Sequence, residues 1–288
     1  MPSTIILKRR ISSIRSTRQI TKAMELVSAS KLRRAQAIAQ QSRDYQELAY
    51  EFLQRLSILP EAESHPMFMR QKIKSRLYVV ITSNSGLAGA YNANINKELL
   101  SKLQRDRDED INSGVIVVGN KGAQFVRRLD HVKLMAVFQP FGDEPKADNI
   151  RPMLNMVMKA YAEQEVEAIE LIYTSFVSTI VQKVTALPIL PVAAPEKDDH
   201  FTNIATFEPD VETVINQVAT RLIEAQLWQA VLESLASEHA MRMVATKNAT
   251  DNANELIDDY TLELNTARQA AITQELAEIT GGAEALNS

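Results

Sequence analysis

Residues 210–280 contain neither glycine nor proline, and this stretch constrains the fold more than any other part of the chain. It is rich in Ala, Leu, Glu, Gln and Met, which lose little side-chain freedom in a helix. A helix of this length would extend roughly 100 Å at ~1.5 Å per residue, further than a globular domain is wide. We therefore expect a long C-terminal helix that ends at Gly281-Gly282, because glycine accepts the left-handed conformation after a helix end.

Glycine and proline are also missing from residues 3–59, which predicts a second helical arm at the N-terminus. Apart from Pro2 and the glycines at 281–282, every glycine and proline lies between residues 60 and 209. This distribution divides the chain into an N-terminal helix over residues 1–59, a turn-containing domain with linkers over 60–209, and a C-terminal helix over 210–288.

Both arms carry small and apolar residues at steps of three and four, the spacing of a coiled-coil seam. The N-terminal seam is expected to contain Leu7, Ile11, Ile14, Met24, Val27, Leu32, Ala35 and Ile38, with Arg18, Thr21, Ser28 and Lys31 intruding near it. The C-terminal seam is expected to contain Val211, Val214, Val218, Leu222, Ala225, Leu232, Ala236, His239, Met243, Thr246, Ala249, Ala253, Leu256, Tyr260, Ala267 and Ala270. Because both arms flank one domain, an antiparallel pair is the plainest way to bury them.

Strand and helix signals alternate through the middle of the chain. Strands are expected at residues 77–82, 115–118, 132–138 and 168–176. Helices are expected at 87–105 and 150–163, and residues 119–122 close the second strand before a short helix that runs through residue 129. Pro188 and Pro191 make residues 184–192 an edge strand or a loop, and 195–209 is expected to be a linker. The predicted fold class is α/β: a long antiparallel coiled coil of the terminal helices with an inserted small, Rossmann-like α/β domain.

Charge is distributed unevenly along the chain. Residues 1–43 hold ten Lys and Arg against one acid, a net charge of +9, which leaves −13 for the rest of a chain whose total is −4. Three interpretations of this basic arm remain open: a helical face in contact with solvent, a surface that binds an acidic protein partner, or a surface that binds nucleic acid. Cysteine is absent, which excludes thiol chemistry, and no apolar run is long enough to span a bilayer.

The sequence contains no convincing catalytic, cofactor or metal site. Gly114 and Gly119 have phosphate-loop spacing, but Asn120 stands where that loop requires Lys. Residues 85–90 follow a strand, yet they lack the three-glycine spacing of a dinucleotide loop. The four histidines are dispersed, with no metal-spaced pair. We therefore expect a non-catalytic chain that binds no cofactor and no metal.

Three segments carry long, specific motifs: residues 11–35, residues 81–92, and residues 238–279, which include 247–253 and 267–276. They resemble the N-terminal helix, the central-domain turn and the C-terminal helix of the gamma subunit of F-type (rotary) ATP synthases. The resemblance covers the whole chain in order, and it is more specific at the two ends than in the middle.

The resemblance implies a central-stalk rotor subunit. Its implied partners are the catalytic and non-catalytic subunits of the hexameric head, the epsilon subunit and the membrane ring of proteolipid subunits. Ring rotation driven by proton flow would be coupled to conformational change at nucleotide sites on the catalytic partners. The implied location is peripheral, on the cytoplasmic face of a bacterial inner membrane.

The same resemblance implies roles for particular residues. Arg268 and Gln269 match the pair that hydrogen-bonds the catch loops of the catalytic subunits, and Thr273, one helical turn further on, is expected to share that contact. Met24 and Arg242 match positions implicated in coupling at the neck of the shaft.

Two positions depart from the family pattern. Asn84-Ser85-Gly86 stands where the family usually has Asp-Arg-Gly, so an electrostatic contact made by that Arg is not expected to carry over unchanged. Ala88 replaces the usual Cys, and thiol control is excluded. Two alternatives from other classes remain: a basic coiled-coil protein that binds nucleic acid, and a small nucleotide-dependent enzyme built on the middle domain.

Overall fold

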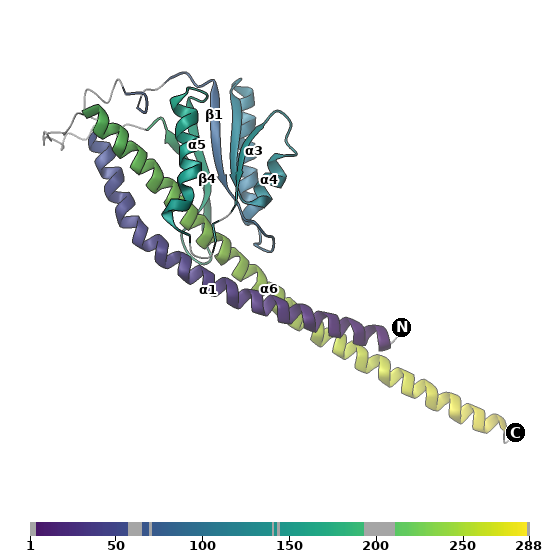
Figure 1. The fold of residues 1–288 in the computed structure, drawn as a ribbon. Helices are drawn as coiled ribbons and strands as arrows, with labels where there is room; N and C mark the ends of the chain where they lie inside the picture. Colours follow the sequence, from purple (N-terminus) through teal and green to yellow (C-terminus); the bar gives the residue numbers. More distant parts are fainter. Residues whose placement is uncertain are drawn as a thin grey trace. The chain divides into compact units, whose positions relative to one another are not determined.

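The computed structural model describes residues 4–56, 65–68, 71–139, 141–142, 145–192 and 211–286 (Figure 1). The expected linker over 195–209 therefore lies outside the described residues. The chain forms two compact units, one made of residues 1–28 with 243–288 and the other of residues 29–242. Helices α1 (Thr4–Leu56) and α6 (Val211–Leu286) contribute residues to both units.

The larger unit contains a five-stranded sheet in the order β3-β2-β1-β4-β5. Its strands are β1 (Ser75–Ile81), β2 (Asn112–Val118), β3 (Lys133–Phe138), β4 (Ala168–Phe176) and β5 (Gln182–Leu190). The first four are parallel neighbours, and β5 pairs antiparallel with β4 at one edge. The expected parallel-dominated α/β sheet is thus confirmed, and residues 184–192 belong largely to an edge strand that begins earlier than expected.

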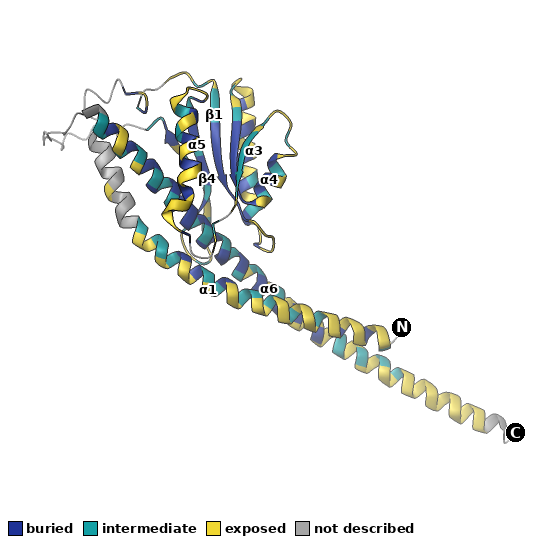
Figure 2. Ribbon diagram, viewed as in Figure 1, coloured by how far each residue is buried: buried dark blue, intermediate teal, exposed yellow. Residues whose placement is uncertain are grey.

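Helices cover both faces of this sheet. The described ones besides α1 and α6 are α3 (Tyr91–Asp108), α4 (Asn120–Val126) and α5 (Arg151–Ala162), preceded by the short 3-10 helix η1 (Ala147–Ile150). Leu77, Val79 and Ile81 of β1 pack on the face covered by α5 and α6, whereas Tyr78 and Val80 pack on the face covered by α3 and α4. This alternation is the period of two expected of a strand buried on both faces. Figure 2 shows the central strands of the sheet as mostly buried.

The turn after β1 differs from its prediction. The expected helix over 87–105 begins only at Tyr91, because Leu87 adopts a positive φ of 59° and interrupts the helical backbone. Residues 82–90 therefore form a loop at the carboxyl end of β1. Thr82 anchors it, since its hydroxyl donates to the carbonyl of Val118 at 2.7 Å and accepts from the amide of Gly122 at 3.0 Å.

A buried ionic cluster fastens β1 to the end of α3. The Asp106 side chain is completely buried and accepts hydrogen bonds from Arg76, from the Tyr78 hydroxyl at 2.7 Å and from the Ser113 hydroxyl at 2.9 Å. The pKa of Tyr78 is raised, chiefly by burial. Three strand residues thus share one carboxylate.

Tyr173, on β4, is a second phenol with a raised pKa, and it packs partly buried against the core. Burial is the larger cause that raises its pKa to about 12, and the charge of Glu233 is the second. Because the folded-state pKa exceeds the unfolded value of about 10, this stabilisation is complete below pH ~10 and is lost as pH rises toward 12.

Raising the pH from 9 to 12 is therefore expected to destabilise the protein, and less so in a Tyr173→Phe variant. The phenylalanine lacks the group whose ionisation in the unfolded state drives the loss, a difference of about 1–2 kcal/mol at high pH. Urea unfolding of both proteins at pH 9, 10 and 11 measures it. An identical pH dependence for parent and variant would contradict the assignment to Tyr173.

The smaller unit is an antiparallel pair of helices. Three contacts join α1 to α6, with partner numbers that fall as the α1 numbers rise. The Arg10 guanidinium lies over the Tyr260 ring at 5.7 Å, Arg18 donates to Asn254 at 3.2 Å, and Thr250 donates to Thr21 at 2.8 Å. The expected antiparallel coiled coil is confirmed.

At several positions of the seam, the residue that is buried is the sequence neighbour of the one predicted. Ser28 is buried and Val27 is 53% exposed, while Ile257 is buried and Leu256 is 44% exposed. The observed α6 seam steps through 246, 250, 253, 257 and 260, a heptad spacing that puts Thr250 against α1. The predicted set of seam residues fits the apolar spacing as well as the observed set does. The hydrogen bond between Thr250 and Thr21 shows which set faces α1.

Helix α6 also continues past its predicted end. It runs through Gly281 and Gly282 to Leu286, and neither glycine adopts a positive φ. A glycine inside a helix costs only about 1 kcal/mol relative to alanine, so the pair permits a helix end without requiring one.

Candidate functional site

Arg242 is the predicted site residue with the most contacts in the described chain. It lies on α6, and only 8% of it is exposed. Its Nε donates to the carbonyl of Gly86 at 3.4 Å, and a terminal nitrogen donates to the Ser85 hydroxyl at 3.2 Å. One guanidinium therefore joins the long helix to the loop after β1.

Internal hydrogen bonds shape that loop for its contact with Arg242. The Asn92 side chain accepts from the Ser83 amide at 3.0 Å and donates to the Ser83 hydroxyl at 2.8 Å. The Ser83 hydroxyl in turn donates to the carbonyl of Ser85 at 2.7 Å. Ser85 occupies the position where the resemblance led us to expect Arg, and its hydroxyl accepts a hydrogen bond from Arg242.

Glu238 balances the charge of Arg242, from one turn earlier on α6. The two side chains form an ion pair at 2.6 Å, with 12% and 9% of their areas exposed. Burial raises the pKa of Glu238, and the charges of Arg242 and Lys31 partly offset that effect. His239 completes the cluster, with its Nδ1 3.4 Å from Arg242. Removing one partner of such a pair leaves a buried charge uncompensated.

Helix α6 also occupies the crevice at the carboxyl edge of the sheet. In open α/β sheets this crevice, where the strand order reverses, is the usual ligand site. The reversal here falls between β1 and β4, and α6 contacts both sides of it through Arg242 at the β1 loop and through Ser234 and Ser237 at Thr174 of β4. Residues 115–118, which follow the first glycine of the phosphate-loop spacing, lie in strand β2.

The other predicted site residues lie in the coiled-coil unit. Met24 is half-buried on α1. Arg268, Gln269 and Thr273 are all exposed on α6, and the Thr273 hydroxyl donates to the carbonyl of Gln269 at 3.0 Å. The three residues predicted to form the catch thus lie within two turns of one helix, whereas Met24 and Arg242 belong to different units.

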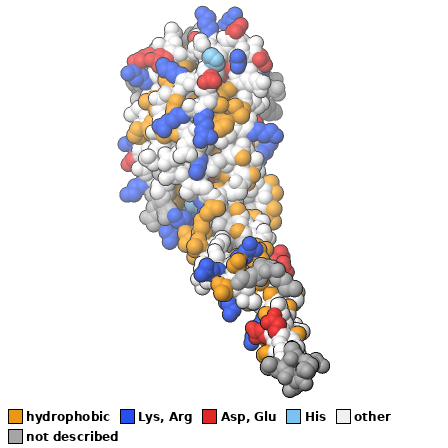
Figure 3. Space-filling view, turned by 90° about the vertical axis from the view of Figure 1, so that its right-hand side faces the viewer, with side chains coloured by type: hydrophobic (Ala, Val, Ile, Leu, Met, Phe, Trp, Pro, Cys, Tyr) orange, Lys and Arg blue, Asp and Glu red, His pale blue; other side chains and the backbone are white. Residues whose placement is uncertain are grey.

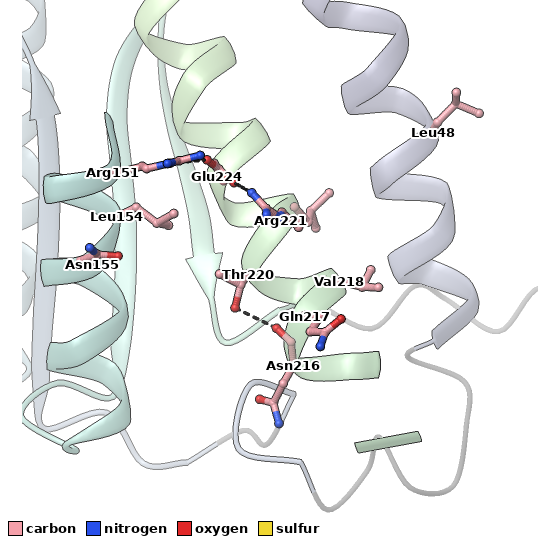
Figure 4. A pocket seen from close by; sticks show the side chains of 11 residues that line it. Leu48, Arg151, Leu154, Asn155, Asn216, Gln217, Val218, Thr220, Arg221 and Glu224 are labelled. Carbon is pink, nitrogen blue, oxygen red and sulfur yellow. Dashed lines mark hydrogen bonds and ion pairs between the residues drawn. The ribbon is translucent and has the colours of Figure 1, made fainter. Parts of the chain in front are cut away.

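A groove of the larger unit lies between α5 and the start of α6, with Leu48 of α1 also lining it (Figure 4). Arg221 pairs with Glu224 at 2.7 Å, and Arg151 approaches the same carboxylate at 3.9 Å. The two arginines share one acid, so the groove presents no catalytic grouping. On the face drawn in Figure 3, Lys and Arg side chains lie among acidic and neutral ones.

Within the described ranges, no group of three or more His, Cys, Asp or Glu side chains could hold a metal ion. None of the helices in the described part of the chain is both long enough and apolar enough to cross a membrane.

Sequence reasoning missed Glu238, Ser234 and Ser237. A Glu four residues before an Arg on one helix was a readable signal for an ion pair. Nothing in the sequence placed the two serines against a strand some 60 residues earlier.

Comparison with known proteins agrees with this architecture. The model of a protein family described as ATP synthase matches residues 3–286. The ATP synthase gamma chains of Xylella fastidiosa (strain M12) and Stenotrophomonas maltophilia (strain R551-3) are each 39% identical to this chain over 282 residues, covering 97% of it and 98% of the relative. The chain therefore belongs to the ATP synthase gamma chain family.

Solved structures show the same fold. A chain of the Euglena gracilis mitochondrial ATP synthase in rotational state 3 matches with a TM-score of 0.69 at 19% identity, covering 98% of this chain and 94% of that one. A chain of the Tetrahymena thermophila mitochondrial ATP synthase central stalk and c-ring matches with a TM-score of 0.62 at 25% identity, covering 80% and 99%. Neither the sequence relatives nor the solved structures support the alternative that this chain is a coiled-coil protein that binds nucleic acid.

Proposed function

We propose that this chain is the central-stalk rotor subunit of an F-type ATP synthase. It couples proton-driven rotation of a membrane ring to conformational change at nucleotide sites on other subunits. The observation that carries the proposal is an antiparallel helix pair continuous with a sheet domain, in a chain similar over nearly its full length to gamma chains. The chain itself is non-catalytic in this proposal.

Its partners are the catalytic and non-catalytic subunits of the hexameric head, the epsilon subunit and the proteolipid ring. We place it on the cytoplasmic face of a bacterial inner membrane, as a peripheral subunit. Functionally it has three segments: helical arms over residues 1–59 and 210–288, and a base over 60–209. Coupling requires each orientation of the shaft to contact one partner conformation better than the others, because only differential binding shifts a population.

The exposed surface of the coiled-coil unit suits such a shaft. In the described part, α6 beyond residue 270 is exposed throughout, without an aromatic side chain. Binding hot spots favour Trp, Tyr and Arg. Residues 271–283 contain none of these three, although Ile272, Leu276 and Ile279 are exposed, so this surface should hold no orientation strongly. Met24 and Arg242 are the proposed coupling residues near the neck of the shaft, and Arg268, Gln269 and Thr273 the proposed catch.

Co-purification tests this function. The chain, carrying an affinity tag, is co-expressed with the other subunits of its ATP synthase, and the eluate is assayed for head subunits and ATP hydrolysis. Elution with the catalytic and non-catalytic subunits in an active complex is the expected result. A chain that elutes alone while the head assembles without it would contradict the proposal.

Replacing Arg268 and Gln269 together with Ala is expected to weaken assembly or ATP-driven proton pumping. An Arg fork can pair bidentately with a partner carboxylate, and that contact would be lost. The isolated chain should keep its stability within about 0.5 kcal/mol, because both side chains are exposed.

Gln274→Ala is the matched control for this double variant, since Gln274 is exposed on the same helix and bonds only Glu278, at 3.0 Å. Pumping and assembly are measured in membranes for all three proteins. If the double variant and the control gave indistinguishable values, the proposed role of Arg268 and Gln269 in the catch would be wrong.

A further inference from the structure

Strand β4 extends beyond its neighbour β1 at the carboxyl edge of the sheet. The β1–β4 ladder ends with the pair Val80↔Ile172, whereas β4 continues to Phe176. Past Ile172, the edge of β4 that faces β1 has no strand to pair with. Buried backbone N–H and C=O groups need partners, so the groups of Thr174 must be satisfied in another way.

Two serines of α6 supply those partners. The Thr174 amide donates to the Ser234 hydroxyl at 3.1 Å, and the Ser237 hydroxyl donates to the Thr174 carbonyl at 3.1 Å. Ser234, Ser237 and Thr174 are each at most 2% exposed. Residues three apart lie on the same face of a helix, so this serine pair follows the backbone of β4 as a strand would.

The serine pair differs from the rest of the contact between α6 and the sheet. Earlier in α6 the contact is apolar, made by Ala219, Leu222, Ile223, Leu227, Ala230 and Val231. Apolar contact is non-directional, so it holds a helix against a sheet without fixing its rotation. Hydrogen bonds weaken steeply when their angle changes, and two of them one turn apart restrict both rotation and sliding.

We propose that Ser234 and Ser237 are positioning residues that hold α6 in one rotational setting on the α/β domain. Rotation of the domain is then transmitted to α6 without slipping. The inference rests on the proposed rotor function and adds a second polar contact between α6 and the α/β domain, besides that of Arg242 with the loop after β1. Small neighbours allow the close approach, since Ala236 and Ala240 are also buried.

The test uses the complete ATP synthase in membrane vesicles, assembled with the parent chain or with Ser234→Ala/Ser237→Ala. The double variant is expected to hydrolyse ATP at close to the parent rate while ATP-driven proton pumping falls. Thr220→Ala is the matched control, because its hydroxyl donates only within α6, to Asn216 at 2.7 Å. That control should keep the parent ratio of pumping to hydrolysis.

Hydrogen exchange gives a second readout, which does not depend on assembly. In the full-length chain, Ser234→Ala should speed exchange of the Thr174 amide by roughly tenfold, the factor that corresponds to one lost hydrogen bond. Ser237→Ala should affect that amide less, because it removes a donor to the carbonyl. Unchanged exchange in Ser234→Ala would overturn the contact itself.

The outcomes separate the two proposals. A parent chain that fails to assemble or pump counts against the rotor function. If the parent pumps and the double variant keeps the parent ratio of pumping to hydrolysis, the positioning role is wrong and the rotor function stands. If the double variant loses hydrolysis and pumping in equal proportion, the two serines have a structural role only. That result also overturns the inference.

Discussion

Replacing Asp106 with alanine is expected to lower the free energy of unfolding by about 3–5 kcal/mol, the usual cost of removing one partner from a buried ion pair. The carboxylate is completely buried and accepts from Arg76, Tyr78 and Ser113, three donors on two strands. Its loss leaves the Arg76 charge, with a side chain only 11% exposed, without its ion-pair partner.

Urea unfolding followed through Trp228 measures this effect, because the only tryptophan of the chain packs against the core of the larger unit. Glu109→Ala is the control, since that carboxylate forms an exposed pair with Arg105 and should contribute at most about 1 kcal/mol. A loss below about 1 kcal/mol for Asp106→Ala would show that water replaces the carboxylate at little cost.

Gly119→Ala should destabilise the larger unit by on the order of 4 kcal/mol, through strain and a backbone clash together. Gly119 has a φ of +96°, and a Cβ there would lie 2.3 Å from the Thr82 carbonyl oxygen. The obstacle is backbone, so no side chain can rotate away. Any relief must displace the loop after β1, which receives the hydrogen bonds of Arg242.

Gly86→Ala in the same region is the comparison, because a Cβ at Gly86 meets no atom within 4 Å. That variant should stay within about 0.5 kcal/mol of the parent in the same urea experiment. Equal stability of the two glycine variants would contradict the close approach of β2 to the loop after β1.

Local patterns predicted most of the fold. Val115 to Val118 is a β-branched apolar run between two glycines, and the stretch 150–163 has helical periodicity. Their placement therefore required no knowledge of the rest of the chain. The two arms flanking one domain predicted the antiparallel pairing, and the family motifs supplied the rotor function. They also supplied the catch residues, whose role remains a prediction.

Features that depend on contacts between distant residues could not be predicted in this way. Apolar spacing alone permits either Leu256 or Ile257 to be the buried residue of the seam. The hydrogen bond between Thr21 and Thr250 accompanies the arrangement in which Ile257 is buried. The Asp106 cluster unites residues of α3, β1 and β2, and the serine pair depends on β4 outrunning β1 by several residues. Nothing in the local sequence marks these polar residues as buried, so their contacts were not predicted.

Direct observation of rotation tests the central claim, that this chain turns as a shaft within its complex. The head is fixed to a surface, a bead is attached to the α/β domain, and ATP is added. The account predicts unidirectional, ATP-dependent rotation of the bead. A bead that stays still while the same complexes hydrolyse ATP at their full rate would contradict it.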